Sequence, residues 1–235
     1  MKLLELFSGT GSVGKVAKKL HWEVVSLDLN NADINCNILD WDYRQYPSGY
    51  FDFVWASPPC IEYSIAKTTG VRKIDEANKI VMKPIETIEY FKPAVWFIEN
   101  PQTGLLKKQV SMDGLPYKDI DYCKYGMPYR KITRLWNNLD TWKPRDLCLR
   151  DCGNIDGNRH KETAQRAPSG RKENWKENYT LFKQNDLYEV PEPLVEEIMT
   201  AVNFVCFRYS RCHALPLDIL CLPLGQLLWR CLRQR

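Results

Sequence analysis

Residues 51 to 60, FDFVWASPPC, join a strongly apolar run to two prolines and a cysteine. The run from 51 to 56 is typical of a buried parallel strand, because such strands are covered on both faces. The prolines at 58 and 59 cannot continue a sheet ladder, so the strand must end before them. Cys60 is therefore predicted at the carboxyl end of a strand, where open α/β sheets bind their ligands. A thiol there can act as a covalent nucleophile, although a cysteine in a loop is more often inert.

The first hundred residues repeat this pattern of short apolar runs separated by amphipathic stretches. Apolar runs predict strands at 3–7, 23–27, 51–56 and 94–98, and helical spacing predicts helices at 12–20 and 74–91. This alternation predicts an α/β fold with a mostly parallel sheet. The loops that follow parallel strands meet at one edge, so their side chains can converge on one site.

The bulk composition fits a folded protein with one large domain. The chain has 235 residues, 44% of them hydrophobic, and a net charge of +4, which permits a polyanionic partner without requiring one. Its nine cysteines accompany no signal-peptide pattern at 1–9 and no apolar run of the ~20 residues that a membrane span needs. We therefore expect reduced thiols, a cytoplasmic protein that is not secreted, and no membrane contact.

Changes in composition divide the chain into four parts. Residues 1–138 are predicted to form the core, and the polar, basic stretch 139–185 forms a small insertion that meets phosphates or, alternatively, a solvated linker. Residues 186–203 return to the core as a closing helix with prolines at its start. The leucine-rich and cysteine-rich stretch 204–235 has no clean period, and we expect a weakly specified extension rather than a partner-binding or membrane-touching tail.

A glycine-rich turn follows the first predicted strand. Residues 7–14, FSGTGSVG, place glycines in G-x-G-x-x-G spacing, which allows a tight turn and a close approach of a ligand to the backbone. Asp28 ends the second predicted strand, where a carboxylate can bind ribose hydroxyls. Together these features indicate an adenosine-containing cofactor, either a dinucleotide or S-adenosylmethionine.

A second candidate catalytic group lies in WFIENP, residues 96–101. This segment ends the strand predicted at 94–98 with Glu99 and Asn100. Between apolar neighbours, the Glu99 carboxyl group could act as an acid or a hydrogen-bond donor. A surface or helix-capping role is the alternative when Glu99 is considered alone.

These segments, in this order, resemble the cytosine-5 DNA methyltransferase family over residues 1 to about 203, and the short viral and phage members most of all. The similar segments are FSGTGSVG (7–14), SPPC (57–60), IEN (98–100), YGMPYRKITRLWNN (125–138) and VPEPLVEEIM (190–199). The resemblance implies a class I, Rossmann-like methyltransferase fold and S-adenosylmethionine as cofactor. It implies cofactor contacts from Phe7, Ser8, Gly9, Thr10, Gly11, Asp28, Asn37 and Pro58, with Asn37 standing where an acidic residue is usual.

The resemblance also implies a reaction. The Cys60 thiolate would attack C6 of a cytosine flipped out of the duplex, and Glu99 would bind N3 and the exocyclic amine. In place of the family's Q-x-R-x-R, this chain has YRKITR at 129–134, so the arginine role falls to Arg130 and Arg134. Ser64 and Asn100 are expected to contact the flipped nucleotide.

Three substrate assignments remain open. We expect a monomer that acts on double-stranded DNA, in the host cytoplasm or nucleus if the protein is viral. A transfer RNA cytosine is the second possibility, and a non-catalytic nucleic-acid-binding relative is the third. An adenine amino-methyltransferase is disfavoured, since its loop would need a D-P-P-Y type sequence and would leave Cys60 without a role.

The insertion carries a separate candidate site. Cys148, Cys152 and His160, together with Cys123, could supply four zinc ligands, because thiolates and imidazole suit zinc. The C-x3-C-x7-H spacing is not that of a standard zinc finger, and ordinary reduced cysteines are the alternative.

Overall fold

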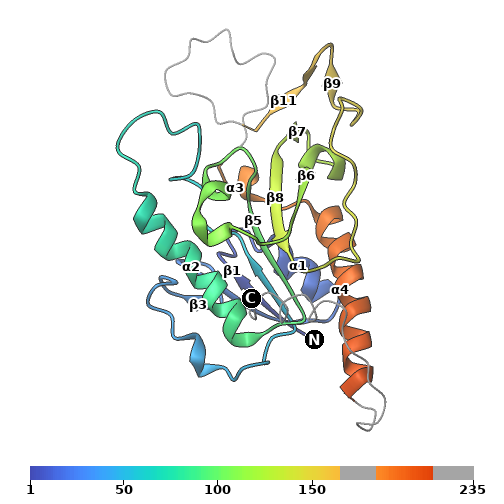
Figure 1. Ribbon diagram of the computed structural model, residues 1–235. Helices are drawn as coiled ribbons and strands as arrows, with labels where there is room; N and C mark the ends of the chain where they lie inside the picture. Colours follow the sequence, from blue (N-terminus) through green and yellow to red (C-terminus); the bar gives the residue numbers. More distant parts are fainter. Residues whose placement is uncertain (165–183, 214–235) are drawn as a thin grey trace, which may run out of the picture.

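A seven-stranded sheet forms the centre of the computed structural model, which describes residues 1–164 and 184–213 (Figure 1). The strand order is β3-β2-β1-β4-β5-β8-β6. The first five strands in this order run parallel, whereas β8 lies antiparallel between β5 and β6. The predicted α/β fold with a mostly parallel sheet is confirmed. The strands are β1 (Lys2–Leu6), β2 (Glu23–Asp28), β3 (Ile34–Asn35), β4 (Phe53–Ala56), β5 (Val95–Pro101), β6 (Tyr117–Asp121) and β8 (Ile132–Asn137).

Helices cover both faces of this sheet. Helices α1 and α4 pack on one face and α2 on the other, as Figure 1 shows. Neighbouring strand residues therefore enter different cores: Leu3 faces α1 and α4, and Leu4 faces the side of α2, and both are fully buried. This arrangement explains why the strands are apolar runs rather than alternating patterns. The helices are α1 (Ser12–Lys19), α2 (Ile74–Phe91), α3 (Gln184–Tyr188) and α4 (Glu192–His213), with 3-10 turns η1 (Tyr43–Gln45), η2 (Leu106–Lys108), η3 (Val110–Met112) and η4 (Tyr122–Tyr125).

The described part of the insertion forms small strand pairs at one end of the molecule (Figure 1). Strand β9 (Ile155–Asp156) pairs antiparallel with β10 (Arg159–His160), and β11 (Glu162–Thr163) pairs with β7 (Tyr129–Arg130) of the core. Residues 165–183, which carry much of the predicted basic stretch, lie outside the described residues.

Several predicted boundaries differ from the structure, and the strand predicted at 94–98 continues to Pro101. Strand β4 begins at Phe53 rather than at residue 51, and Phe51 packs edge-on against Phe91 with ring centroids 4.9 Å apart. Helix α4 continues to His213, so the boundary predicted at 203 falls inside it. Val202 and Cys206 are both buried in the core, and this burial explains the continuation. The remainder of the predicted extension, residues 214–235, lies outside the described residues. Within the described ranges, no helix is long and apolar enough to cross a membrane.

Candidate active site

A cavity of about 380 Å³ opens at the carboxyl ends of β1, β2, β4 and β5. The strand order reverses at β1, and open α/β sheets bind ligands at such a point. The volume lies in the range of small-molecule sites, roughly 300–1,000 Å³. The residues that line it include Phe7, Ser8, Gly9, Thr10, Asp28, Asn37, Pro58, Cys60, Glu99 and Lys131. The cavity therefore joins the glycine-rich turn to the cysteine loop.

The glycine-rich turn is built from backbone in the left-handed region. Phe7, Gly9 and Gly11 have φ of 57°, 51° and 66°, so the chain reverses tightly between β1 and α1. The Gly9 N–H donates to Asp28 Oδ2 at 2.8 Å, and the Leu29 N–H donates to Asp28 Oδ1 at 2.7 Å. Asp28 is thereby fixed at the cavity wall, and each carboxylate oxygen keeps a lone pair for a ligand hydroxyl.

A buried carboxyl group lies beneath this turn. Glu5 accepts the Val13 and Gly14 N–H groups at 3.2 and 3.0 Å, at the start of α1. Burial raises the pKa of Glu5 to about 7, against the lowering effect of these two hydrogen bonds. A Cβ atom added at Gly14 would lie 2.5 Å from Glu5 Oε2, so only glycine allows this approach. The pair fixes the position of α1 on β1.

The cysteine loop is attached to the neighbouring strand. The Asn100 side chain donates from Nδ2 to the Pro58 carbonyl at 2.9 Å, and Ala56 pairs with Ile98 in the ladder. The Cys60 thiol is half-buried at the cavity wall. Burial and then the Glu99 carboxylate raise the pKa of Cys60, while the Lys131 ammonium lowers it. The thiol form is favoured, and Lys131 is the cation that opposes it.

Glu99 is 7% exposed and faces the same cavity from within β5. Tyr122 donates its hydroxyl to Glu99 Oε1 at 3.2 Å, and Lys131 Nζ lies 3.9 Å from the same oxygen. A thiol, a carboxyl group and an ammonium group thus meet at the cavity wall, and the buried Tyr122 phenol holds the carboxyl group from behind. Such a set can add a nucleophile to an electron-poor ring and stabilise the charge that develops.

Comparison with known proteins identifies the family. No family model matches the chain. The "Probable DNA (cytosine-5)-methyltransferase" of Frog virus 3 (isolate Goorha) is 34% identical over 174 residues, which is 67% of this chain and 80% of that protein.

The chain belongs to the C5 cytosine DNA methyltransferase family.

Solved structures of methyltransferases are similar at lower identity. A methyltransferase encoded within an E. coli prophage shows 14% identity and a TM-score of 0.46, over 63% of this chain and 52% of the other. Dnmt2 of S. pombe shows 15% identity and a TM-score of 0.42, over 57% and 50%. Each match spans only about half of the solved chain.

The structure places most predicted cofactor residues of this family member around the cavity. Seven line it: Phe7, Ser8, Gly9, Thr10, Asp28, Asn37 and Pro58. Gly11 does not line it, and instead its carbonyl accepts the Lys15 N–H at the start of α1. The Asn37 side chain accepts the Leu39 N–H at 3.0 Å, so its oxygen is already partly engaged.

The two predicted catalytic arginines point to other partners. Arg130 makes two hydrogen bonds of 3.0 Å to the fully buried Asp121, and Arg134 makes bonds of 2.7 and 2.9 Å to Asp119. Neither lines the cavity. Asp119 lies directly opposite Arg134 in the β6–β8 ladder, so the pairing follows from strand register. Both arginines link neighbouring strands in this structure, and the catalytic roles predicted for them stay predictions.

Lys131 is the cation that the sequence analysis missed. It lies between β7 and β8 and lines the cavity beside Cys60 and Glu99. The alternation of strand side chains sends it to the opposite face from its neighbour Arg130. One signal in the sequence could have predicted this. Asp119 and Asp121, two residues apart on β6, supply ion-pair partners for both arginines and leave Lys131 for the cavity.

The two predicted substrate contacts do not line the cavity. Asn100 is buried and holds the Pro58 carbonyl, so it positions the cysteine loop. The Ser64 hydroxyl accepts the Ala66 N–H at 3.2 Å within a turn after Cys60. Arg72 donates to the Glu62, Ser64 and Lys67 carbonyls at 2.8 Å each, and this contact holds the turn.

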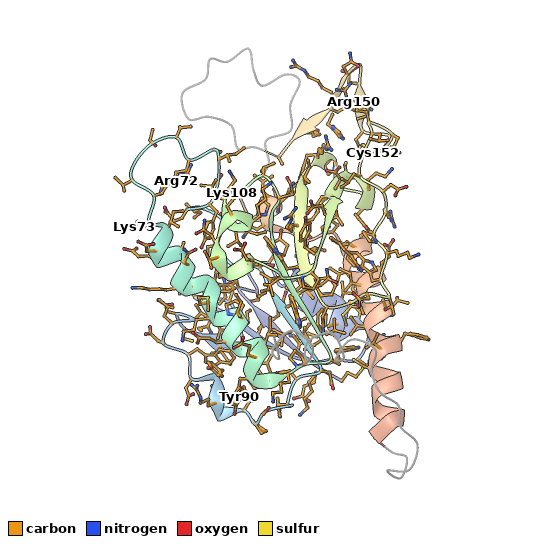
Figure 2. All side chains as sticks on the ribbon, in the orientation of Figure 1. Arg72, Lys73, Tyr90, Lys108, Arg150 and Cys152 are labelled. Carbon is orange, nitrogen blue, oxygen red and sulfur yellow. The ribbon has the colours of Figure 1, made fainter. Side chains whose placement is uncertain are left out.

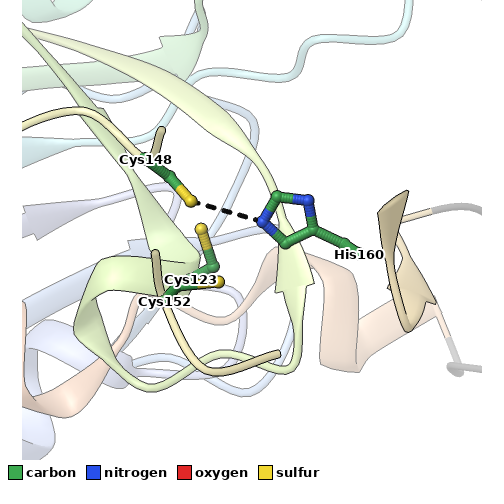
Figure 3. Close-up of side chains that lie close together, drawn as sticks. All are labelled: Cys123, Cys148, Cys152 and His160. Atoms are coloured by element: carbon green, nitrogen blue, oxygen red, sulfur yellow. Dashed lines mark hydrogen bonds between the residues drawn. The ribbon is translucent and has the colours of Figure 1, made fainter. Parts of the chain in front are cut away.

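The four predicted zinc ligands lie together outside this cavity. The ligand atoms of Cys123, Cys148, Cys152 and His160 all lie within 4.8 Å of one another. Figure 3 shows the three sulfur atoms and the imidazole ring around a common space. Cys123 comes from η4 of the core, whereas the other three come from the insertion.

Proposed function

We propose that the protein transfers a methyl group from S-adenosylmethionine to C5 of cytosine in double-stranded DNA. The observation that carries this proposal is the position of Cys60, Glu99 and Lys131 on the wall of the cavity that also holds the glycine-rich turn and Asp28. Family membership supports the reaction class.

The cavity residues fit S-adenosylmethionine. Asp28 presents a fixed carboxylate for ribose hydroxyls, and the turn at Gly9 exposes backbone to a ligand. Ile38 and Pro58 supply apolar wall for an adenine ring. When bound, this cofactor supplies a methyl sulfonium, which a carbon nucleophile can attack.

Cys60 generates that nucleophile in the proposed mechanism. Its thiolate would add to C6 of cytosine, the C5–C6 π pair would shift to C4–C5, and the C4–N3 π pair would move onto N3. C5 would then be an enamine carbon that takes the methyl group, while the methyl–sulfur bond breaks and its electron pair stays on sulfur as a neutral thioether. A base then removes the C5 proton, and the thiolate leaves to restore the aromatic ring. Because burial and Glu99 raise the pKa of Cys60, the Lys131 charge is needed to favour its thiolate.

Glu99 would hold the cytosine ring during this addition. The Tyr122 hydroxyl and Lys131 Nζ both lie close to Glu99 Oε1, and these two contacts fix the orientation of the Glu99 carboxyl group. The group would bind N3 and the exocyclic amine, where charge develops as sulfur adds to C6. A stacked base cannot reach this cavity wall, so the nucleotide must flip out, which costs roughly a few kcal/mol.

Duplex DNA is the proposed substrate because the similar viral protein is named as a probable DNA (cytosine-5)-methyltransferase, and several cationic side chains lie toward the insertion end of the molecule. Figure 2 labels Arg72, Lys108 and Arg150 toward this end, whereas Tyr90 lies at the opposite end. The net charge is +4. Exposed cations such as Lys108 and Arg150 would bind phosphates and help to orient a duplex.

Trapping the covalent intermediate tests the proposal. The protein is incubated with S-adenosylmethionine and duplex DNA in which 5-fluorocytosine replaces cytosine, and adducts are resolved by denaturing electrophoresis. Fluorine cannot leave as a proton does, so we expect a stable adduct that contains Cys60. Cys60→Ser should form no adduct while it still binds the cofactor.

The other outcomes are equally informative. An adduct with 5-fluorocytosine RNA but not with DNA would replace the proposed substrate by RNA. Absence of an adduct with either nucleic acid, at saturating cofactor, would overturn the catalytic proposal and favour a non-catalytic binding protein. The full chain is used throughout.

A further inference from the structure

The four side chains that gather between the core and the insertion lie apart from the cavity and take no part in the proposed reaction. They are Cys123, Cys148, Cys152 and His160. The first two are buried and the last two are partly exposed. Three thiols and one imidazole at such short range are a set that soft and borderline metal ions bind.

The one sulfur–nitrogen separation given by the structure is close to that expected around a tetrahedral metal ion. Zn–S bonds of about 2.3 Å and Zn–N bonds of about 2.0–2.1 Å place a sulfur and a nitrogen ligand about 3.6 Å apart. Cys148 Sγ and His160 Nε2 are 3.4 Å apart, and all pairs of ligand atoms lie within 4.8 Å (Figure 3). Only a small adjustment would bring all four ligands to bonding distance.

The local backbone is shaped to bring the ligands together. Arg150 and Gly153 have φ of 71° and 79°, so the chain turns back around the two cysteines of the insertion. The β9–β10 hairpin turns at Gly157, with φ of 54°, and returns His160 to the same place. Two left-handed turns and a hairpin are thus used to gather four side chains.

The hairpin part of the insertion is short and largely exposed. Its strands β9 and β10 have two residues each, and Leu149 is 86% exposed. Two-stranded hairpins are marginal in water, and a metal ion can replace the missing core. A metal that joins Cys123 of η4 to the hairpin would supply this cross-link.

We propose that these four residues bind one structural Zn²⁺ ion that fastens residues 148–160 to the catalytic core. Four protein ligands complete a tetrahedral shell and leave no open position for a substrate. Binding releases the protons of the thiols.

The site also fixes residues next to the catalytic carboxylate. Cys123 directly follows Tyr122, whose hydroxyl contacts Glu99. The Cys148 N–H donates to Asp121 Oδ2 at 2.9 Å, and Asp121 immediately precedes Tyr122. The metal would therefore hold the segment that positions Glu99 as well as the hairpin.

Metal analysis of the purified full chain tests the site. After expression with added zinc and gel filtration, we expect about one zinc ion per chain by elemental mass spectrometry. Cys152→Ser should lose at least fivefold of this zinc. Cys60→Ser is the matched control: it removes a thiol outside the cluster and should keep the metal.

A second measurement does not depend on a variant that folds. The wild-type chain is treated with chelator under reducing conditions, and Co²⁺ is added. Tetrahedral thiolate coordination predicts intense visible d–d bands together with a thiolate-to-cobalt charge-transfer band. Hydrogen exchange should show faster exchange in residues 148–160 without metal, with the sheet still protected.

Several results would overturn the site. They are zinc content far below one per chain, loss of zinc in Cys60→Ser, absence of cobalt bands, or a disulfide among Cys123, Cys148 and Cys152 in the freshly purified protein. The readout is metal content, so a protein without methyltransferase activity would leave this proposal standing.

Discussion

Lys131 places one positive charge beside two acidic groups, the Cys60 thiol and the Glu99 carboxyl group. It lowers the pKa of the Cys60 thiol, which favours the nucleophilic form, and it lies 3.9 Å from Glu99 Oε1. In Lys131→Met, the pKa of Cys60 should rise further, so the pH dependence of its alkylation should move to higher pH. For a pKa increase of about one unit, the fraction of Cys60 present as thiolate at a fixed pH below the pKa should fall on the order of 10-fold.

This prediction is measured by iodoacetamide labelling of the Cys60 peptide across pH, read by mass spectrometry so that the other cysteines do not interfere. Lys131→Arg keeps the charge and should keep the wild-type profile. Identical profiles for wild type and Lys131→Met would contradict the assigned role.

Glu5 makes the stability of the fold depend on pH. Its pKa is 4.5 in its ordinary environment and about 7 in the folded protein, because of burial. The folded state therefore binds this proton more tightly than the unfolded state does. The resulting contribution to the free energy of unfolding is present below pH 4.5 and is lost as the pH rises through about 7. The full difference is on the order of 3 kcal/mol.

Urea unfolding at pH 5 and pH 8 checks this prediction against Glu5→Gln. The variant loses one hydrogen-bond acceptor and should be less stable at pH 5, but the change in its free energy of unfolding between the two pH values should be smaller. Equal pH dependence of the two proteins would show that Glu5 is not the titrating group.

At the scale of elements, the contact of α1 with β1 depends on one missing Cβ atom. In Gly14→Ala, the new atom would lie 2.5 Å from Glu5 Oε2 and 3.1 Å from Val24 Cγ1. We expect a lower free energy of unfolding by about 1–3 kcal/mol, which is typical of overpacking. The exposed Lys18→Ala, in the same helix, should change it by less than about 0.5 kcal/mol. A Gly14→Ala protein as stable as wild type would contradict the packing described.

The elements themselves were largely predictable from sequence. Apolar runs and helical spacing located β1, α1, β2 and α2 within a residue or two, since burial on both faces leaves an unbroken apolar signal. Which of two adjacent cations faces the cavity was not predictable. Arg130 and Lys131 differ by one position, and a slip of one residue exchanges the two faces of a strand.

The extent of α4 was missed for a related reason. Val202 and Cys206 of this helix pack against strands that are distant in the sequence. The local sequence near residue 203 therefore does not indicate these contacts. The gathering of four zinc-type ligands was predicted from residue type alone, but their mutual distances come only from the folded insertion.

At the scale of the whole molecule, cofactor binding should stabilise the fold by mass action. S-adenosylmethionine at a hundred times its Kd should raise the free energy of unfolding by about 2.7 kcal/mol. Asp28→Ala should lose most of this gain at the same cofactor concentration, because it removes the carboxylate that faces the cavity and the acceptor for the Gly9 N–H. Cys60→Ser should retain the gain. Thermal unfolding with and without the cofactor measures both, and an undiminished gain in Asp28→Ala would contradict the assigned contact.

The pairing of Ala56 with Ile98 has a consequence for how such a protein can diversify. The strands that carry Cys60 and Glu99 are neighbours in one ladder, and Asn100 joins their ends. Their separation is set by the sheet, whereas the β9–β10 hairpin, residues 155–160, projects from elsewhere on the chain. Substitutions at exposed positions of that hairpin would leave the spacing of the Cys60 loop and Glu99 unchanged, because the β4–β5 ladder sets this spacing. If the proposed function holds, exposed residues of the insertion are free to vary in sequence while the sheet keeps the reacting groups in register.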